Sequence, residues 1–207
     1  MSVQILYRTV GRWKENSYLL LHNNKGWLID PGDGFTMLDH EFNCPGITIL
    51  GIINTHGHFD HLGAVSAFKE KYSLPFYIHS KDKQLVHQAN LYRKLAGDNT
   101  VIKTPAIDFF LDDSPGLLLE DKKIIIHHTP GHSHGSVCFE VDHCLISGDL
   151  LFEKNIGRTD LPGGNLEMLK SSIKFVLHNF QGYTIYPGHG QPFVLDSAVI
   201  EGLNKLL

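Results

Sequence analysis

The sequence of 207 residues has little of three features that would each place it in a particular class of protein. Its three cysteines (Cys44, Cys138 and Cys144) form neither a CxxC pair nor an even framework, which excludes a disulfide-stapled secreted fold. No apolar run approaches the roughly 18 residues that a membrane-spanning helix needs. Basic residues are not in excess either, since 18 Lys and Arg stand against 22 Asp and Glu. This balance argues against a general binder of nucleic acid or anionic membranes.

Two further absences narrow the location and the ligands. Residues 1–10 contain no basic segment followed by an apolar one, so no secretory signal is visible and we expect a cytoplasmic protein. The glycine-rich segment 155–164 lacks the phosphate-loop form GxxxxGK[ST], so nucleotide binding is not expected. We interpret Cys138 and Cys144 as small apolar residues of a hairpin. The length suits one well-filled domain over residues 1–207.

Histidine, in contrast, is abundant, with 14 copies. The segment 55–61 reads THGHFDH and contains His56, His58, Asp60 and His61 within six positions, which we call the hexad. Imidazole nitrogen and carboxylate oxygen are ligands that suit zinc, iron and manganese. A lone histidine usually has a simple structural explanation, but four such side chains in six positions rarely do. The hexad therefore predicts a metal site.

The residues on either side of the hexad predict where this site lies. Residues 47–54 form a mostly apolar, β-branched run that is typical of a strand buried on both faces. Residues 62–72 carry apolar side chains at the three- and four-residue spacing of a helix. The ligands would then lie between the end of a buried strand and a helix, where α/β sheets form binding crevices. Gly57 is expected to let the backbone bend so that His56 and His58 point to one place.

Three later segments place a histidine or an aspartate beside glycine, just past a predicted strand. They are TPGH ending at His132, SGD ending at Asp149 and PGH ending at His189. All three could converge with the hexad on one sheet edge.

Other candidates at strand ends are weaker. His79 closes a short predicted strand, and the pair His127 and His128 precedes TPGH; we expect none of these to be a ligand. His134 forms an HxH pair with His132, and it too is expected to lie outside the site.

The rest of the chain predicts a mixture of α and β elements. Apolar patterning predicts strands over 4–10, 17–22, 25–29, 76–78, 117–120, 122–128, 136–141, 143–147 and 183–186, and helices over 36–42, 81–96 and 166–178, with an apolar helix-like tail after residue 198. The long loop 97–114 could either cover the site or pack on the surface through Phe109 and Phe110.

The hexad, the three glycine-containing motifs and the segment LIDPG (residues 28–32) together resemble the metallo-β-lactamase superfamily. They span residues 28–190 in that family's order. The resemblance implies an α+β fold, the αββα four-layer sandwich, in which two similar halves pack their mixed sheets together with helices outside.

The resemblance also implies a ligand set for two divalent metal ions, zinc first, with iron or manganese as alternatives. The first metal would be held by His56, His58 and His132. The second would be held by Asp60, His61 and His189, and Asp149 would bridge the two metals. A hydroxide held between the metals would attack the substrate carbonyl, with Asp60 orienting it as the catalytic residue. Asp30 is either a turn former or a residue that braces the ligand loop.

The substrate expectation rests on a narrower resemblance. The GRTD loop (residues 157–160) and the short chain resemble glyoxalase II-like hydrolases, which implies a small-molecule thioester such as S-lactoylglutathione. The chain departs from them, because 18 residues after His189 cannot form the further helical domain that helps to hold glutathione. Arg158 could pair with a substrate carboxylate or with an internal acid such as Asp160. A mononuclear iron persulfide dioxygenase, a lactonase and another hydrolase of the same fold, including a lactamase, remain alternatives.

Overall fold

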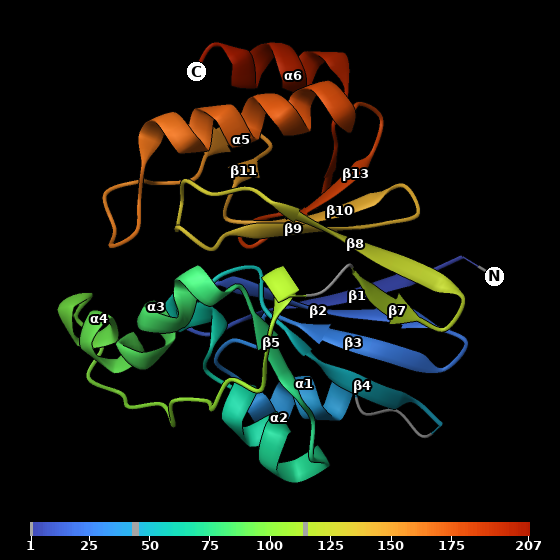
Figure 1. Ribbon diagram of the computed structural model, residues 1–207, viewed down its shortest axis with the longest axis vertical. Helices are drawn as coiled ribbons and strands as arrows, with labels where there is room; N and C mark the ends of the chain where they lie inside the picture. The colour runs from blue at the N-terminus through green and yellow to red at the C-terminus, as the bar shows by residue number, and fades with distance from the viewer. Residues whose placement is uncertain (1, 43–45, 114–115) are drawn as a thin grey trace.

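Two six-stranded sheets stacked face to face form the centre of the computed structural model, which describes residues 2–42, 46–113 and 116–207 (Figure 1). The first sheet has the order β1 (Gln4–Val10), β2 (Glu15–His22), β3 (Lys25–Ile29), β4 (Thr48–Ile53), β5 (Phe76–Ile78), β6 (Phe109–Phe110). The second has the order β14 (Phe193–Val194), β13 (Thr184–Pro187), β10 (Cys144–Gly148), β9 (Val137–Val141), β8 (Lys122–His128), β7 (Leu117–Leu119). A short ribbon of β11 (Leu151–Phe152) and β12 (Asn155–Ile156) stands apart from both.

Helices cover the outer face of each sheet, which completes four layers (Figure 1). The first sheet is covered by α1 (Phe35–Phe42) and α2 (Val65–Tyr72), and the second by α5 (Leu166–Asn179) and α6 (Ser197–Asn204). The helices α3 (Lys83–His87) and α4 (Ala89–Leu95) lie at one end of the molecule. The expected αββα sandwich is confirmed. Within the described residues, no helix has the length and apolar character needed to cross a bilayer.

Alternation along the central strands explains the layers. On β2, Leu19 belongs to the core beneath the helices α1 and α2, whereas Tyr18 and Leu20 belong to the core between the sheets. On β4, Ile52 and Ile53 divide in the same way. Successive side chains of a strand point to opposite faces, so a strand between two cores must be apolar at every position. This burial on both faces explains the unbroken apolar runs that the sequence shows in these strands.

Strand direction brings the predicted motifs to one edge. The strands β3, β4 and β5 are parallel, so the segments after β3 and β4 leave the first sheet on the same side. In the second sheet β10 and β13 are parallel, so Asp149 and His189 follow strands that end together. A hydrogen bond of 2.7 Å from Asn16 N to Gly188 O joins the two sheets at this edge.

Four local expectations are corrected or completed by the structure. The predicted helix over 81–96 is two helices, α3 and α4, which meet at Gln88 and follow a 3-10 turn at Ser80–Asp82. The helix predicted over 62–72 begins only at Val65, as α2, and Asp60 and His61 lie before it on a 3-10 turn, Phe59–His61. The loop 97–114 ends in strand β6, where Phe109 stacks on Tyr77; its residue Ser114 lies outside the described residues. Cys138 and Cys144 are free on the β9–β10 hairpin, and Cys44 also lies outside the described residues.

Candidate metal centre

The seven side chains named from the sequence form two neighbouring groups at this sheet edge. The candidate ligand atoms of His56, His58 and His132 all lie within 4.8 Å of one another. Those of a second group, Asp60, His61 and His189, do the same. The turns after β4, β8 and β13 therefore supply both groups, as the motif order predicts.

Asp149 lies between the two groups and touches both. Its Oδ2 is 3.5 Å from His132 Nε2 and 3.4 Å from His189 Nε2. Its Oδ1 is 3.7 Å from His61 Nε2. A carboxylate that contacts both groups can bridge two cations.

Four buried polar atoms of the cluster have no hydrogen-bond partner among the described residues: His56 Nε2, His58 Nε2, His61 Nε2 and Asp149 Oδ1. Each buried polar atom left unsatisfied costs about 1–3 kcal/mol. His58 directs Nδ1 to His132 Nε2 at 2.8 Å, so its Nε2 lies on the other side of the ring. The free nitrogens of His56 and His61 and the free oxygen of Asp149 belong to the ligand groups, where cations would satisfy them. The donor set and its uncompensated atoms therefore fit divalent metal ions.

Electrostatics differs between the two groups. Burial and neighbouring histidines lower the pKa of His58 to about 3 and that of His56 well below its usual value, so both rings are neutral, the form that binds metals. Burial also lowers the pKa of His61 and His189, but the surrounding carboxylates outweigh it and raise these pKa values to about 10 and about 11. Burial raises the pKa of Asp149, but His189 and His61 outweigh it and hold that pKa well below the usual value.

The second ring nitrogens of His56 and His61 are held by Asp30 and Thr55. Asp30 Oδ2 lies 3.1 Å from His61 Nδ1, and both Asp30 oxygens accept hydrogen bonds from Thr55, at 2.7 Å from its backbone N and 2.6 Å from its Oγ1. Thr55 Oγ1 in turn lies 3.0 Å from His56 Nδ1. Asp30 is close enough to His56 and His61 to count as a ligand, but its oxygens are occupied. This geometry favours the bracing role over metal coordination.

Backbone carbonyls hold two of the remaining histidines. His132 Nδ1 donates to the carbonyl oxygen of Arg158 at 2.8 Å, and His189 Nδ1 donates to that of Lys14 at 3.2 Å. These contacts place the protons on Nδ1 and leave Nε2 of both rings near Asp149. His132 Nε2 also lies 2.8 Å from His58 Nδ1.

Asp82 is a further residue of the centre, and no motif pointed to it. It is fully buried, and its Oδ2 accepts from Gly57 N at 2.8 Å and from Ser133 Oγ at 2.6 Å, while Oδ1 accepts from Gly135 N at 2.7 Å. It thus ties the hexad turn to the turn that carries His132. Gly57 does not adopt a left-handed conformation. A Cβ there would lie 3.0 Å from Asp82 O, so the glycine allows the two segments to approach closely.

Glu15 was also missed. It is 1% exposed, its Oε1 lies 3.8 Å from His61 Nδ1, and its Oε2 accepts from Ser17 Oγ at 3.1 Å. Burial raises the pKa of this carboxyl well above its usual value. Its sequence signal is weak, because Glu15 begins a run of three polar residues that precede the apolar part of β2.

Comparison with known proteins agrees with this centre. The model of one protein family, described as the metallo-beta-lactamase superfamily, matches residues 10–189. The chain belongs to the metallo-beta-lactamase superfamily. The match includes all seven candidate ligands.

Relatives within the superfamily place the chain among metal-dependent hydrolases. It is 34% identical to "Probable metallo-hydrolase YqgX" of Bacillus subtilis, over 87% of each chain. It is 33% identical to "Probable metallo-hydrolase MJ0888" of Methanocaldococcus jannaschii, over 86% of this chain and 89% of the relative.

Solved structures of the superfamily are also similar. TTHA1623 in a di-iron-bound form has a TM-score of 0.82 and 36% identity, covering 92% of this chain and 94% of that one. The BLEG-1 B3 metallo-beta-lactamase has a TM-score of 0.84 and 32% identity, covering 93% of this chain and 94% of that one.

The other histidines considered from the sequence lie outside the metallo-beta-lactamase centre. His79 and His128 stack on each other at 4.3 Å, and His127 Nε2 lies 2.7 Å from Glu140. His134 is exposed, and its backbone oxygen accepts from His128 Nε2.

Arg158 forms the internal ion pair rather than presenting a free cation. Its Nε and Nη2 donate to the two carboxylate oxygens of Asp160 at 2.7 and 2.5 Å. The residue contributes to the centre through its backbone carbonyl on His132.

A cleft of about 700 Å³ opens beside the centre. His58, Asp60, His132, Asp149 and His189 line its floor, and mostly apolar side chains line its walls. Of the described part of the loop 97–114, no residue lines this cleft; α4 and residue Ala96 stand there instead, so that loop does not cover the site.

Proposed function

We propose that this chain is a dinuclear metallohydrolase that cleaves small-molecule thioesters, as glyoxalase II-like enzymes do. One metal ion would be held by His56, His58 and His132, the other by Asp60, His61 and His189, with Asp149 bridging. The observation that carries the proposal is the position of Asp149, within 3.7 Å of histidines from both groups. The di-iron form of TTHA1623 supports a site for two metals and makes iron a candidate beside zinc and manganese.

Metal ions bound there would supply Lewis acidity toward a substrate carbonyl and activate water near neutral pH. The side chains of the protein would orient the attacking water and hold its proton. Asp60 Oδ2 lies 3.4 Å from His189 Nε2, and the side chain is 14% exposed toward the cleft. Its carboxylate can accept a hydrogen bond from the attacking water and orient it toward the carbonyl. Phe59 and Trp13, packed edge to face at 5.5 Å, exclude bulk water from that side.

The thioester assignment rests on the short glyoxalase II-like pattern with its GRTD loop, and the cleft is compatible with it. A thioester presents an uncharged carbonyl to the metals, and apolar walls can accept the groups on either side. No Ser-His or Cys-His pair needs to act as nucleophile, since Cys138 is buried and burial raises its pKa to about 12.

The test is loss of thioester absorbance from S-lactoylglutathione, with anaerobically purified protein whose metals are counted in the same sample. Turnover with two metals per chain is expected, and Asp149→Ala is expected to abolish both turnover and dinuclear loading. Absence of turnover with two metals bound would refute the thioester part. A single iron with oxygen uptake on glutathione persulfide would replace the proposal by the dioxygenase alternative.

β-Lactam hydrolysis is a second candidate, favoured by the similarity to BLEG-1. Hydrolysis of nitrocefin and a carbapenem in the same preparation separates the two. A kcat/KM for a β-lactam above that for every thioester would move the assignment to lactamase.

A further inference from the structure

The walls of the cleft come from four separate segments and are apolar. Trp13 belongs to the β1–β2 turn, Tyr92 and Leu95 to α4, Phe152 to the β11–β12 ribbon, and Leu161 to the loop before α5. The volume of about 700 Å³ is typical of sites for small molecules. Side chains of this kind gain free energy only when an apolar group covers them.

The part of the cleft wall that α4 forms is held in place, although the apolar side chain that it presents there is exposed to solvent. Leu95 is 74% exposed. Two residues earlier, Arg93 is buried and ion-paired, with Nη1 donating to Asp33 Oδ1 at 3.0 Å and Nη2 lying 2.9 Å from Asp98 Oδ2. Asp33 follows β3, so this pair anchors α4 to the segment beside the metal centre. The exposed leucine therefore stands on a fixed wall, which favours a preformed site.

The same cleft offers little to a substrate with several charges. Among its described lining residues, Arg158 is the one Lys or Arg, and its Nε and Nη2 are paired with Asp160. Glutathione carries two carboxylates on its thiol side. Burying these carboxylates against apolar walls would cost desolvation free energy, and the described part of the cleft offers no Lys or Arg free of an ion pair that would compensate this cost.

We propose that this cleft selects thioesters with an apolar, uncharged acyl chain seated against Leu95 and Tyr92 of α4, and disfavours a glutathione moiety. The inference rests on the proposed thioesterase function and narrows its substrate class. S-lactoylglutathione then serves to detect thioester hydrolysis, but it is not the substrate that fits the cleft best.

The test compares acetyl, butyryl and hexanoyl thioesters of N-acetylcysteamine, an uncharged thiol, and hexanoylglutathione. Burial of one methylene is worth about 0.8 kcal/mol, so kcat/KM should rise about fourfold per added methylene. Hexanoyl-N-acetylcysteamine should exceed hexanoylglutathione by about tenfold, as expected for uncompensated buried charge.

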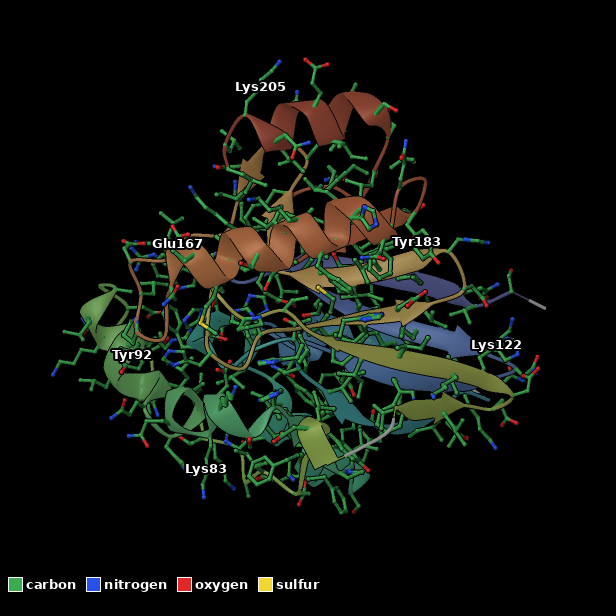
Figure 2. The ribbon with its side chains drawn as sticks, turned by 45° about the horizontal axis from the view of Figure 1, so that its top comes forward. Lys83, Tyr92, Lys122, Glu167, Tyr183 and Lys205 are labelled. Carbon is green, nitrogen blue, oxygen red and sulfur yellow. The ribbon has the colours of Figure 1, made fainter. Side chains whose placement is uncertain are left out.

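Leu95→Asp should flatten the chain-length dependence, because it replaces the apolar surface against which the longer acyl chains lie by a carboxylate. The matched control is Leu118→Asp on β7, where the leucine is 66% exposed. Figure 2 shows Lys122, whose strand pairs with β7, at the opposite end of the molecule from Tyr92 on α4. The control should keep the full dependence.

The outcomes separate the inference from the function on which it rests. Cleavage of thioesters with no gain from acetyl to hexanoyl, or with a preference for glutathione, would overturn the inference and keep the thioesterase. If no thioester is cleaved, calorimetry with the non-hydrolysable S-hexyl-N-acetylcysteamine and S-hexylglutathione decides. Tighter binding of the uncharged thioether, weakened by Leu95→Asp, would uphold the apolar selectivity; equal or weaker binding would overturn it.

Discussion

Replacement of Asp82 by asparagine should weaken both the fold and the metal centre. The buried carboxylate accepts three hydrogen bonds, from Gly57 N, Gly135 N and Ser133 Oγ. Asparagine has the same shape, but its NH₂ group is a donor. Whichever way the amide is turned, that donor faces at least one backbone N–H. At least one bond is therefore lost, and a buried N–H is left without an acceptor.

The least costly orientation places the NH₂ group toward Gly135 N and loses one bond to a carboxylate. Such bonds contribute about 1.5–3 kcal/mol, so we expect Asp82→Asn to lower the free energy of unfolding by about 2–3 kcal/mol. For a chain of this length each kcal/mol corresponds to roughly 2–4 °C in Tm, which predicts a fall of about 4–12 °C. Because Asp82 aligns the turns that carry His58 and His132, metal affinity should fall about 10–100-fold.

Denaturant unfolding of the metal-free protein and metal titration against a competing chelator measure the two effects separately. The matched control is Asp112→Asn, an exposed carboxylate that accepts two hydrogen bonds from Ser80 at 2.8 and 2.6 Å. It should change stability by less than about 1 kcal/mol and leave metal affinity unchanged. Wild-type stability and affinity in Asp82→Asn would refute the alignment role.

Four shorter predictions concern the same centre. Asp149→Ala should remove both metals in elemental analysis, whereas His134→Ala should keep the full metal content; one metal retained in the first variant, or one lost in the second, would contradict the ligand assignment. Arg158→Ala should leave kcat/KM within about threefold, because its backbone carbonyl and not its side chain holds His132; a fall of more than about tenfold would show a direct role. Chelation of the metals should lower Tm by an amount equivalent to about 3 kcal/mol when the free metal had been near 100 times Kd; an unchanged Tm would mean that no metal is bound. Metal binding at pH 7.5 should release protons, since pKa values of about 10 and about 11 keep His61 and His189 protonated in the metal-free protein and both must become neutral to bind, so that affinity rises with pH; equal calorimetric heats in buffers of different ionisation enthalpy would contradict this.

The residues at the centre that could be predicted from the sequence are those with local patterns. His56, His58, Asp60 and His61 lie in one hexad, and the turns with His132, Asp149 and His189 each combine glycine with a preceding apolar run. A parallel arrangement then brings strand ends together, so convergence followed from the pattern of strands. The four-layer fold came from the family resemblance, because periodicity alone indicates only mixed α and β elements.

Asp82 and Glu15 could not be predicted, because what makes them part of the centre is distant in sequence. Asp82 meets Gly135 across 53 residues, and nothing around residue 82 differs from an ordinary polar helix start. Glu15 begins a strand whose burial on both faces depends on the second sheet. The break of the predicted helix at Gln88 and the two-residue strand at Phe109–Phe110 likewise depend on tertiary packing, which propensity does not contain.

In several of these histidines the two ring nitrogens have different surroundings, and this difference is the strongest argument that the cluster binds cations. His56, His61, His132 and His189 each direct Nδ1 to a fixed oxygen of the protein, at 2.8–3.2 Å. The Nε2 atoms of His56 and His61 have no described partner, and that of His189 faces a carboxylate. His132 Nε2 lies 2.8 Å from His58 Nδ1 and 3.5 Å from Asp149 Oδ2.

A hydrogen-bonded polar core would satisfy both nitrogens within the protein, since each unsatisfied atom costs about 1–3 kcal/mol. Four such atoms together would cost roughly 4–12 kcal/mol, as much as the whole stability of many domains. The chain tolerates that cost at a place that opens to a cleft through Asp60, Asp149 and His189. Metal ions that reach the centre through the cleft would compensate this free-energy cost, which explains why the chain keeps these atoms unsatisfied.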